Sequence, residues 1–157
     1  MAASAIDWEW DETETEEAAA TTAGRLFSVA FAPDRKTAEL RCRDLTDDII
    51  RWSHRLLTPA EDRVAMAADA DNVYVALYWH GSTGCQVLAF DGGSGRRLWE
   101  TRLVGLGSVG HSRYANRVQM RIREGKVAVF GNEASGKYIE VLDPATGEQV
   151  QHRKVEG

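Results

Sequence analysis

A short motif occurs three times along this chain, and the repetition constrains its fold more than any other feature. Each copy begins with an aspartate, has a turn residue four positions later and a large side chain eight positions later. The copies are Asp44 to Trp52, Asp91 to Trp99 and Asp143 to Gln151. The aspartates are 47 and 52 residues apart (91 minus 44, 143 minus 91), which is close to the ~40–50 residues of one propeller blade. We therefore expect a protein built from repeated sheets.

Alternating apolar residues around each motif predict four short strands per repeat. Upstream of the second aspartate, for example, Val87 and Ala89 occupy alternate positions, which is typical of a strand with one buried face. Similar runs precede and follow the motif in the other copies. The predicted fold is all-β, with about three four-stranded antiparallel propeller-type blades near residues 24–56, 62–103 and 116–153.

The motif itself predicts a tight hairpin between the third and fourth strands. The aspartate can accept a hydrogen bond from the backbone two residues on, and a glycine at the fifth position can take a positive φ without steric cost. Asp48 replaces this glycine in the first copy, and aspartate tolerates the left-handed conformation better than most residues. The tryptophans are interpreted as wedges between neighbouring sheets rather than as a cofactor-stacking surface. The structural repeat signature comprises Asp44, Trp52, Asp91, Gly95, Trp99, Asp143 and Gly147.

The second copy resembles a known repeat. Its run from Val87 to Trp99 is similar to the Val-Tyr-Ala-Leu-Asp-x-x-Thr-Gly-x-x-x-Trp signature of the pyrroloquinoline-quinone-like (PQQ-like) β-propeller family, and Ile139 to Gly147 is a second match. The first copy, Leu40 to Trp52, keeps the aspartate and the tryptophan but lacks the Thr-Gly pair. The resemblance covers residues 24–153 and implies propeller blades. It does not select a chemistry, because the family includes quinone-dependent dehydrogenases and noncatalytic scaffolds such as outer-membrane assembly lipoproteins.

Three blades are fewer than the ~4–8 that close a propeller. We divide the chain into an acidic N-terminal segment, residues 1–22, and a repeat domain, residues 23–157. The segment is either a solvated tail or an exchanged strand, since Trp8 and Trp10 alternate with acidic residues. The partial propeller would be completed by a homodimer with two-fold symmetry or by neighbouring sequence of a longer polypeptide. A small unclosed sandwich of sheets is the remaining alternative.

The composition of the chain limits the kinds of partner and the cellular compartment that we expect for it. The net charge of -5 argues against a general nucleic-acid surface, and no apolar run approaches the ~18 residues of a membrane span. No signal peptide is visible, so we expect a cytoplasmic protein or a fragment that lost its leader, although many members of the resembled family are periplasmic. Cys42 stands at a strand position that is Ala89 and Val141 in the other copies, which favours a buried free thiol. The histidines and cysteines lack the spacing of ligand sets, so we predict no metal and no cofactor.

The loops that join the second strand to the third, and one sheet to the next, are expected to carry the function. Two of them contain the aromatic, cationic and hydrogen-bonding side chains that are enriched at binding hot spots. The candidate interaction face comprises Trp79, His80, His111, Arg113, Tyr114, Asn132 and Lys137. The alternative is that these side chains are ordinary loop residues without a binding role. We therefore expect a noncatalytic interaction scaffold for a protein or peptide partner of unknown identity.

The alternative function is a fragment or subunit of a quinone-cofactor-binding oxidoreductase. The resemblance implies that such enzymes hold their quinone on the axis of a larger ring, with a calcium ligated by acidic and amide side chains and often with adjacent cysteines. Cys42 and Cys85 are not adjacent, so enzyme activity is disfavoured. Residues 105–110 match G-x-G-x-x-G, but the residues after them alternate as a strand, whereas a dinucleotide site needs a helix N-terminus. A third possibility, a recognition module of a conflict or secretion system, makes no distinct residue prediction.

Overall fold

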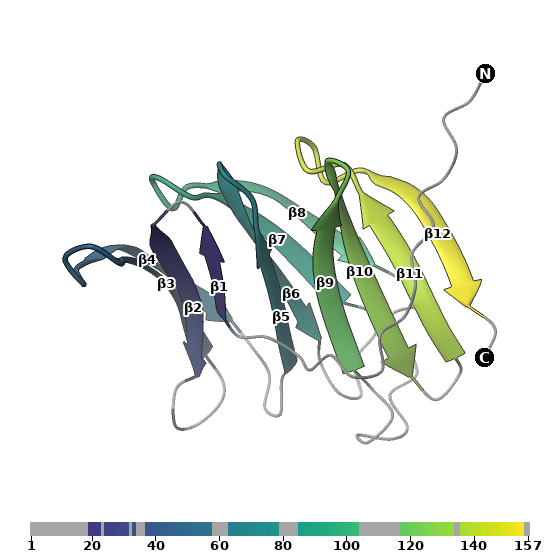
Figure 1. The fold of residues 1–157 in the computed structure, drawn as a ribbon. Coiled ribbons are helices and arrows are strands. Elements are labelled where there is room, and N and C mark those ends of the chain that lie inside the picture. Colours follow the sequence, from purple (N-terminus) through teal and green to yellow (C-terminus); the bar gives the residue numbers. More distant parts are fainter. Residues whose placement is uncertain are drawn as a thin grey trace.

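The computed structural model describes residues 19–22, 24–31, 33, 37–57, 63–78, 85–103, 117–133 and 136–155. Within these residues, twelve strands form three antiparallel sheets in which consecutive strands are hydrogen-bonded (Figure 1). Sheet A contains β1 (Ala19–Thr22), β2 (Arg25–Phe31), β3 (Thr37–Asp44) and β4 (Ile50–Leu57). Sheet B contains β5 (Arg63–Ala68), β6 (Asn72–Tyr78), β7 (Cys85–Asp91) and β8 (Arg97–Leu103). Sheet C contains β9 (Arg117–Arg123), β10 (Lys126–Glu133), β11 (Gly136–Leu142) and β12 (Gln149–Val155). The predicted all-β fold of three four-stranded sheets is confirmed.

The first sheet includes the last residues of the N-terminal segment. Strand β1 pairs with β2, from Ala19 opposite Ser28 to Thr22 opposite Arg25. The last residues of the segment that we separated at residue 22 thus belong to sheet A. Sheets B and C cover residues 63–103 and 117–155, close to the predicted limits.

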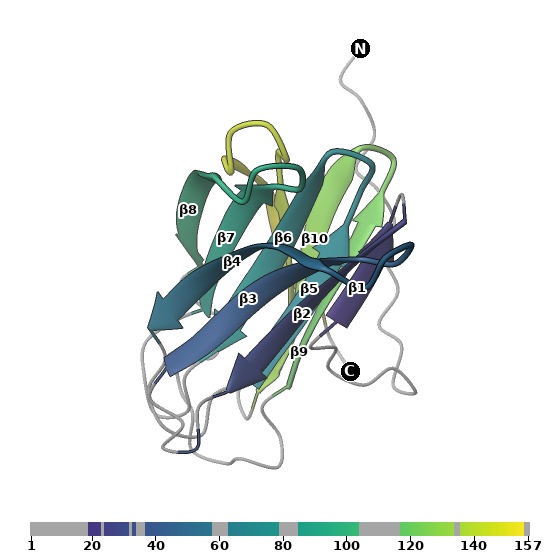
Figure 2. The ribbon, with the colours of Figure 1, turned by 90° about the vertical axis from the view of Figure 1, so that its left-hand side faces the viewer.

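The three sheets stand in a row in the order A, B, C (Figure 1). Strand β1 lies beside β5, and β5 lies beside β9, so the first strands of all three sheets are neighbours. Figure 2 looks from the sheet A end of the row onto the outer face of sheet A, the face turned away from sheet B. Sheet C likewise has an outer face turned away from sheet B. No other described sheet stands beyond either outer face.

Two hydrophobic clusters fill the spaces between the sheets. The first includes Phe27 and Leu40 of sheet A with Val75 and Phe90 of sheet B. The second includes Tyr74 and Val87 of sheet B with Val129 and Leu142 of sheet C. Because the burial of one such side chain contributes ~1.5–3 kcal/mol, packing between the sheets accounts for much of the stability of the row.

Strand β7 shows how the sequence encodes the position of a sheet in the row. Its residues Val87, Leu88, Ala89 and Phe90 are all buried. Leu88 and Phe90 pack in the cluster shared with sheet A, whereas Val87 and Ala89 pack in the cluster shared with sheet C. Strand β3 in sheet A instead alternates buried and partly exposed residues, because its second face is open. A continuous apolar run therefore marks a sheet that is covered on both faces.

Candidate functional site

Most of the predicted interaction face falls on residues that the structure does not describe. Trp79, His80, His111, Arg113 and Tyr114 lie outside the described residues. Asn132 and Lys137 lie opposite each other on β10 and β11, but their side chains also lie outside the described part of the chain. The loop face therefore stays a prediction.

The three signature aspartates shape equivalent turns between the third and fourth strands of their sheets. In each turn, the backbone N–H at the fifth position donates to the carbonyl of the aspartate at 2.8 or 2.9 Å. The aspartate carboxylate also accepts a backbone N–H from within the turn. The donors are Thr46 to Asp44, Ser94 to Asp91 and Ala145 to Asp143. The turn is thus the same in all three sheets, although the first lacks the glycine of the other two.

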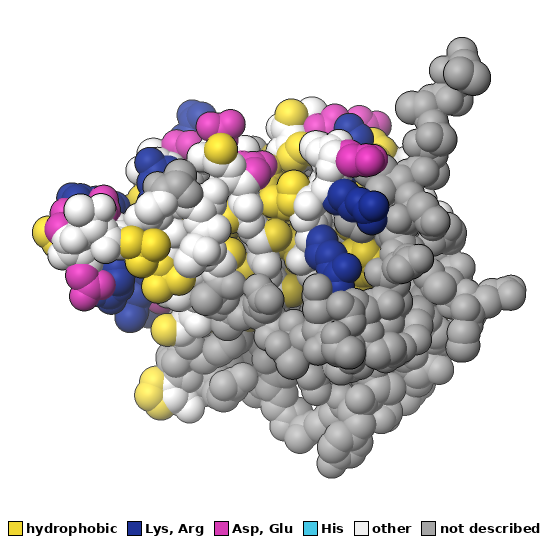
Figure 3. Space-filling view, viewed as in Figure 1, with side chains coloured by type: hydrophobic (Ala, Val, Ile, Leu, Met, Phe, Trp, Pro, Cys, Tyr) yellow, Lys and Arg dark blue, Asp and Glu magenta, His cyan; other side chains and the backbone are white. Residues whose placement is uncertain are grey.

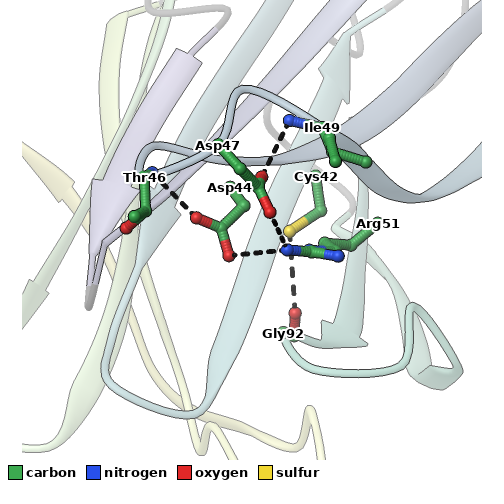
Figure 4. Close-up of polar contacts among 7 residues, drawn as sticks. All are labelled: Cys42, Asp44, Thr46, Asp47, Ile49, Arg51 and Gly92. Atoms are coloured by element: carbon green, nitrogen blue, oxygen red, sulfur yellow. Dashed lines mark hydrogen bonds and ion pairs between the residues drawn. The ribbon is translucent and has the colours of Figure 1, made fainter.

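The first turn adds a charge network to this geometry (Figure 4). The guanidinium of Arg51 lies 3.4 Å from a carboxylate oxygen of Asp44 and also pairs with Asp47. Asp47 in turn accepts the backbone N–H of Ile49 at 3.0 Å. The backbone N–H of Thr46 is the main cause that lowers the pKa of Asp44 below its usual value of 3.8, and the charge of Arg51 lowers it further. The turn is therefore stabilised by an ionised aspartate.

Each tryptophan of the signature reaches the turn of the next sheet. Trp52 donates from Nε1 to the carbonyl of Gly92 at 2.9 Å, and Trp99 makes the same kind of bond to the turn of sheet C at 2.8 Å. The rings lie against glycines. A Cβ added at Gly95 would approach Trp52 to 2.5 Å, and one added at Gly147 would overlap Trp99. The tryptophan of one sheet and the glycine of the next form an interlock, which agrees with the interpretation of the tryptophans as wedges.

Cys42 lies beside the first interlock. Its Sγ is 3.9 Å from the carbonyl oxygen of Gly92 (Figure 4). The same oxygen accepts the indole N–H of Trp52. The thiol is free and buried, as predicted. Burial raises the pKa of Cys42 above its usual value of 9.0, with the charge of Arg25 acting in the opposite direction. The cysteine is therefore a packing residue in its present environment.

The interlock lacks one partner at each end of the row. On sheet A, the position of the interlocking glycine is occupied by Asp48, whose φ of 60° is left-handed. On sheet C, the position of the interlocking tryptophan is occupied by Gln151. Both departures from the signature therefore remove the residue that would interlock with a further sheet packed on the outer face.

The outer face of sheet A is polar and charged. Along β3, Leu40 and Cys42 point toward sheet B, so Glu39, Arg41 and Arg43 alternate with them on the outer face. Along β4, Trp52 and Leu56 pack toward sheet B, which places Arg51, Ser53 and Arg55 on the outer face. These residues are partly or fully exposed. The composition is that of a sheet face in contact with water.

A pocket of about 360 Å³ lies on this outer face, near the connection from β2 to β3. Its volume is within the range of ~300–1,000 Å³ that is usual for ligand sites. Arg41 donates from Nε to Glu39 at 2.6 Å inside it, and Arg55 adds a second guanidinium. The lining residues are Ala30, Pro33, Thr37, Ala38, Glu39, Arg41 and Arg55. Such a lining suits an extended polar segment with a carboxylate, since guanidinium groups bind carboxylates with charge-assisted hydrogen bonds.

Three aliphatic side chains are exposed at the first turn. Leu45, Ile49 and Ile50 are 53%, 52% and 44% exposed. They flank the charged residues of the same turn, so an apolar spot with a charged rim lies at the opposite end of β3 from the pocket. Small apolar spots of this kind on a charged surface are common features of interaction sites.

A buried carboxylate lies in sheet C. Glu140 on β11 is fully buried and accepts hydrogen bonds from the side chains of Gln149 and His152. Both residues lie on the neighbouring strand β12, where His152 is directly opposite Glu140. Burial raises the pKa of Glu140 above its usual value of 4.5, and the hydrogen bond and charge of His152 act in the opposite direction. The imidazole of His152 also stacks on Tyr138, with ring centres 6.3 Å apart. The carboxylate and the imidazole form a hydrogen-bonded pair on one face of sheet C.

Sequence reasoning missed the pocket and this carboxylate. A signal for the pocket was present, because Glu39, Arg41 and Arg55 occupy the alternate positions left by the apolar residues of β3 and β4. A signal for Glu140 was also present, since Leu88 holds the equivalent position in sheet B. A comparison of the three repeats does not show which face of each sheet is covered.

Neither a protein-family model nor a curated protein matches the chain. Among solved structures, the chain is similar to quinohemoprotein alcohol dehydrogenase ADHIIG from Pseudomonas putida HK5, with a TM-score of 0.56 and 16% sequence identity. The three sheets are propeller-type blades. The match covers 90% of this chain but 20% of the dehydrogenase chain, so this chain spans about a fifth of that protein. At this identity the likeness supports a PQQ-like propeller fold and carries no statement about chemistry.

In the part of the chain that the structure describes, no helix is long and apolar enough to cross a membrane. Within the same residues, no group of three or more His, Cys, Asp or Glu side chains is placed to hold a metal ion.

Proposed function

We propose that this chain is a noncatalytic β-propeller repeat module that binds a protein or peptide partner. The pocket on the outer face of sheet A is the observation that supports the proposal. It has the volume of a binding site, and its lining includes Pro33 and Thr37 beside the connection from β2 to β3. This connection is one of the loops expected to form the interaction face.

The lining favours a particular kind of partner segment. Arg41 and Arg55 present guanidinium groups, and arginine is enriched at interaction hot spots. Because Arg41 already pairs with Glu39, an incoming carboxylate would be held by Arg55 with support from Arg41. Ala30 and Pro33 offer a small apolar surface beside these charges. We therefore expect an extended segment that carries an acidic residue next to a small aliphatic one.

A random-peptide display selection on the immobilised full chain tests this function. Selected peptides are synthesised, and their Kd is measured by fluorescence anisotropy against the wild type and the double variant Arg41→Ala/Arg55→Ala. We expect the double variant to bind at least about tenfold more weakly, equivalent to ~1.4 kcal/mol. The matched control is Arg96→Ala, an exposed arginine of the second turn, which should leave the Kd unchanged. Equal binding by the double variant, or failure to select any peptide, would count against the proposal.

A second candidate function rests on the likeness to the quinohemoprotein dehydrogenase. The chain would then be a fragment or subunit of a quinone-cofactor-binding oxidoreductase. Equilibrium dialysis of the full chain against pyrroloquinoline quinone, with and without calcium, distinguishes the two candidates. Saturable binding of about one quinone per chain favours the oxidoreductase, and its absence at micromolar concentrations favours the interaction module.

A further inference from the structure

The outer face of sheet C is apolar, in contrast to that of sheet A. Ala128, Phe130, Ile139 and Val141 form a hydrophobic cluster of their own, separate from the cluster between sheets B and C, and are 0–2% exposed. In sheet B, the equivalents of Ile139 and Val141 are Val87 and Ala89, which pack against the next sheet. Sheet C is the last described sheet of the row (Figure 1). The burial of these four residues therefore requires a cover that the described strands do not supply.

Cations border the same face. On β9, Met120 and Ile122 pack toward sheet B, so Arg121 and Arg123 alternate with them on the outer face. The guanidinium carbon of Arg121 lies 5.4 Å from the centre of the Phe130 ring, which fixes it beside the apolar cluster. Figure 3 shows Lys and Arg side chains over β9, the first strand of sheet C. The cover should therefore combine large apolar side chains with negative charge.

One segment of this chain has that composition. Residues 6–10 alternate apolar and acidic side chains, so that Ile6, Trp8 and Trp10 would share one face of an extended segment. Seven acidic residues and no Lys or Arg precede Ala18. The segment is therefore complementary to the outer face of sheet C in both hydrophobicity and charge.

The segment is also long enough to reach this face. Eighteen residues precede β1, and an extended chain spans at most ~3.3–3.6 Å per residue, or about 60 Å for this length. The path from β1 past β5 and β9 crosses two sheet spacings of ~10 Å and the thickness of sheet C, roughly 30 Å in total. About half of the segment then remains to lie along the face.

A second copy of the chain is a poorer occupant. If two copies stacked head to tail, the outer face of sheet A would bury Glu39, Arg41 and Arg55 against apolar side chains, and burial of charges without partners costs several kcal/mol. If two copies paired through the outer faces of their C sheets, Arg121 and Arg123 of one copy would lie close to the same two arginines of the other copy. These like charges would repel each other. The Trp–Gly interlock is also incomplete at both outer faces, where Asp48 and Gln151 stand.

We propose that residues 6–10 of the same chain cover the outer face of sheet C, with Trp8 and Trp10 on Phe130, Ile139 and Val141, and that the acidic residues between Trp10 and β1 run beside Arg121 and Arg123 on the way to this face. The segment is then neither a solvated tail nor a strand exchanged between copies. It is a cap that completes the last sheet within one chain. This inference does not depend on the proposed function.

The first test uses the full-length double variant Trp8→Ser/Trp10→Ser. We expect a concentration-independent monomer by light scattering for the wild type, a Tm lower by about 5 °C or more in the variant, and increased binding of the dye 1-anilinonaphthalene-8-sulfonate. The matched control is Leu45→Ser/Ile49→Ser, which removes two apolar side chains that are exposed in the first turn. Equal behaviour of variant and control would show a solvated tail, and a wild-type dimer that dissociates in the variant would show exchange between copies. Either result overturns the proposal.

The second test locates the contact. Glu12→Lys/Glu14→Lys and Arg121→Glu/Arg123→Glu should each lower the Tm, because each places like charges together. The combination of all four substitutions should recover at least half of the summed loss, since it restores opposite charges. Additive losses would place the segment elsewhere and would overturn the assignment of this face.

Discussion

The substitution Gly95→Ala tests the interlock between sheets most directly. Gly95 has a φ of +77°, and a Cβ added there would lie 2.5 Å from Cδ2 of Trp52. Two costs follow. An L-residue in the left-handed region costs ~1–2 kcal/mol, and an overpacked contact with a rigid ring costs ~1–3 kcal/mol. We therefore expect the free energy of unfolding to fall by about 2–5 kcal/mol.

A control substitution separates the cost of the contact with Trp52 from the cost of the left-handed backbone. Gly125→Ala is placed at a φ of +71°, and a Cβ there meets no heavy atom within 4 Å. It should therefore show the backbone cost alone. Urea unfolding followed by circular dichroism at pH 7 gives the free energy of unfolding for both variants. The difference between them, ~1–3 kcal/mol, measures the contact with Trp52.

A double-mutant cycle then assigns the difference to the indole. Trp52→Ala alone should cost ~3–5 kcal/mol, because it removes a large side chain from the cluster between sheets A and B. In that background, Gly95→Ala should cost no more than Gly125→Ala does in the wild type. The reasoning is refuted if Gly95→Ala and Gly125→Ala are equally destabilising, or if the loss of Trp52 gives no relief.

Three further substitutions test single groups. The raised pKa of Glu140 means that the contribution of this residue to stability is fully present below the ordinary value of 4.5 and is lost as pH rises through the folded pKa. Glu140→Gln should therefore remove this decline in Tm between pH 4 and 8. Parallel plots of Tm against pH for the variant and the wild type would contradict this prediction. Asp48→Gly should stabilise the protein by about 1 kcal/mol in urea, since it relieves a left-handed φ and loses only an exposed ion pair with Arg43; a net loss would argue against strain at this turn. The hydroxyl of Ser94 is the main cause that lowers the pKa of Asp91 below 3.8, so its contribution is present above 3.8 and lost as pH falls through the folded pKa; Asp91→Asn should flatten the fall in Tm between pH 5 and 2, and an unchanged fall would speak against this role.

Much of the architecture could be predicted because each repeat encodes its own hairpin. Asp91 and Gly95 specify a turn by local hydrogen bonding and by backbone freedom, and neither requires knowledge of the rest of the chain. The partner of Trp52 is different, since it lies forty positions away in the next sheet. A motif that repeats in sequence does not show whether it packs within its own sheet or against its neighbour. The same limit applies to Glu140, whose burial depends on the covering of a face rather than on its own strand.

The charge of sheet A and the apolar character of sheet C lead to opposite expectations for the two ends of the row. An end that exposes Arg41 and Arg55 is stable in water and needs no further sheet, as in the polar caps of other repeat proteins. An end formed by Phe130 and Ile139 needs a cover, and a cover from the same chain leaves sheet A free. If the N-terminal segment closes sheet C in this way, the pocket on sheet A stays accessible in the monomer. The two proposals are therefore independent in their tests but compatible in one molecule, with one end sealed and the other open to a partner.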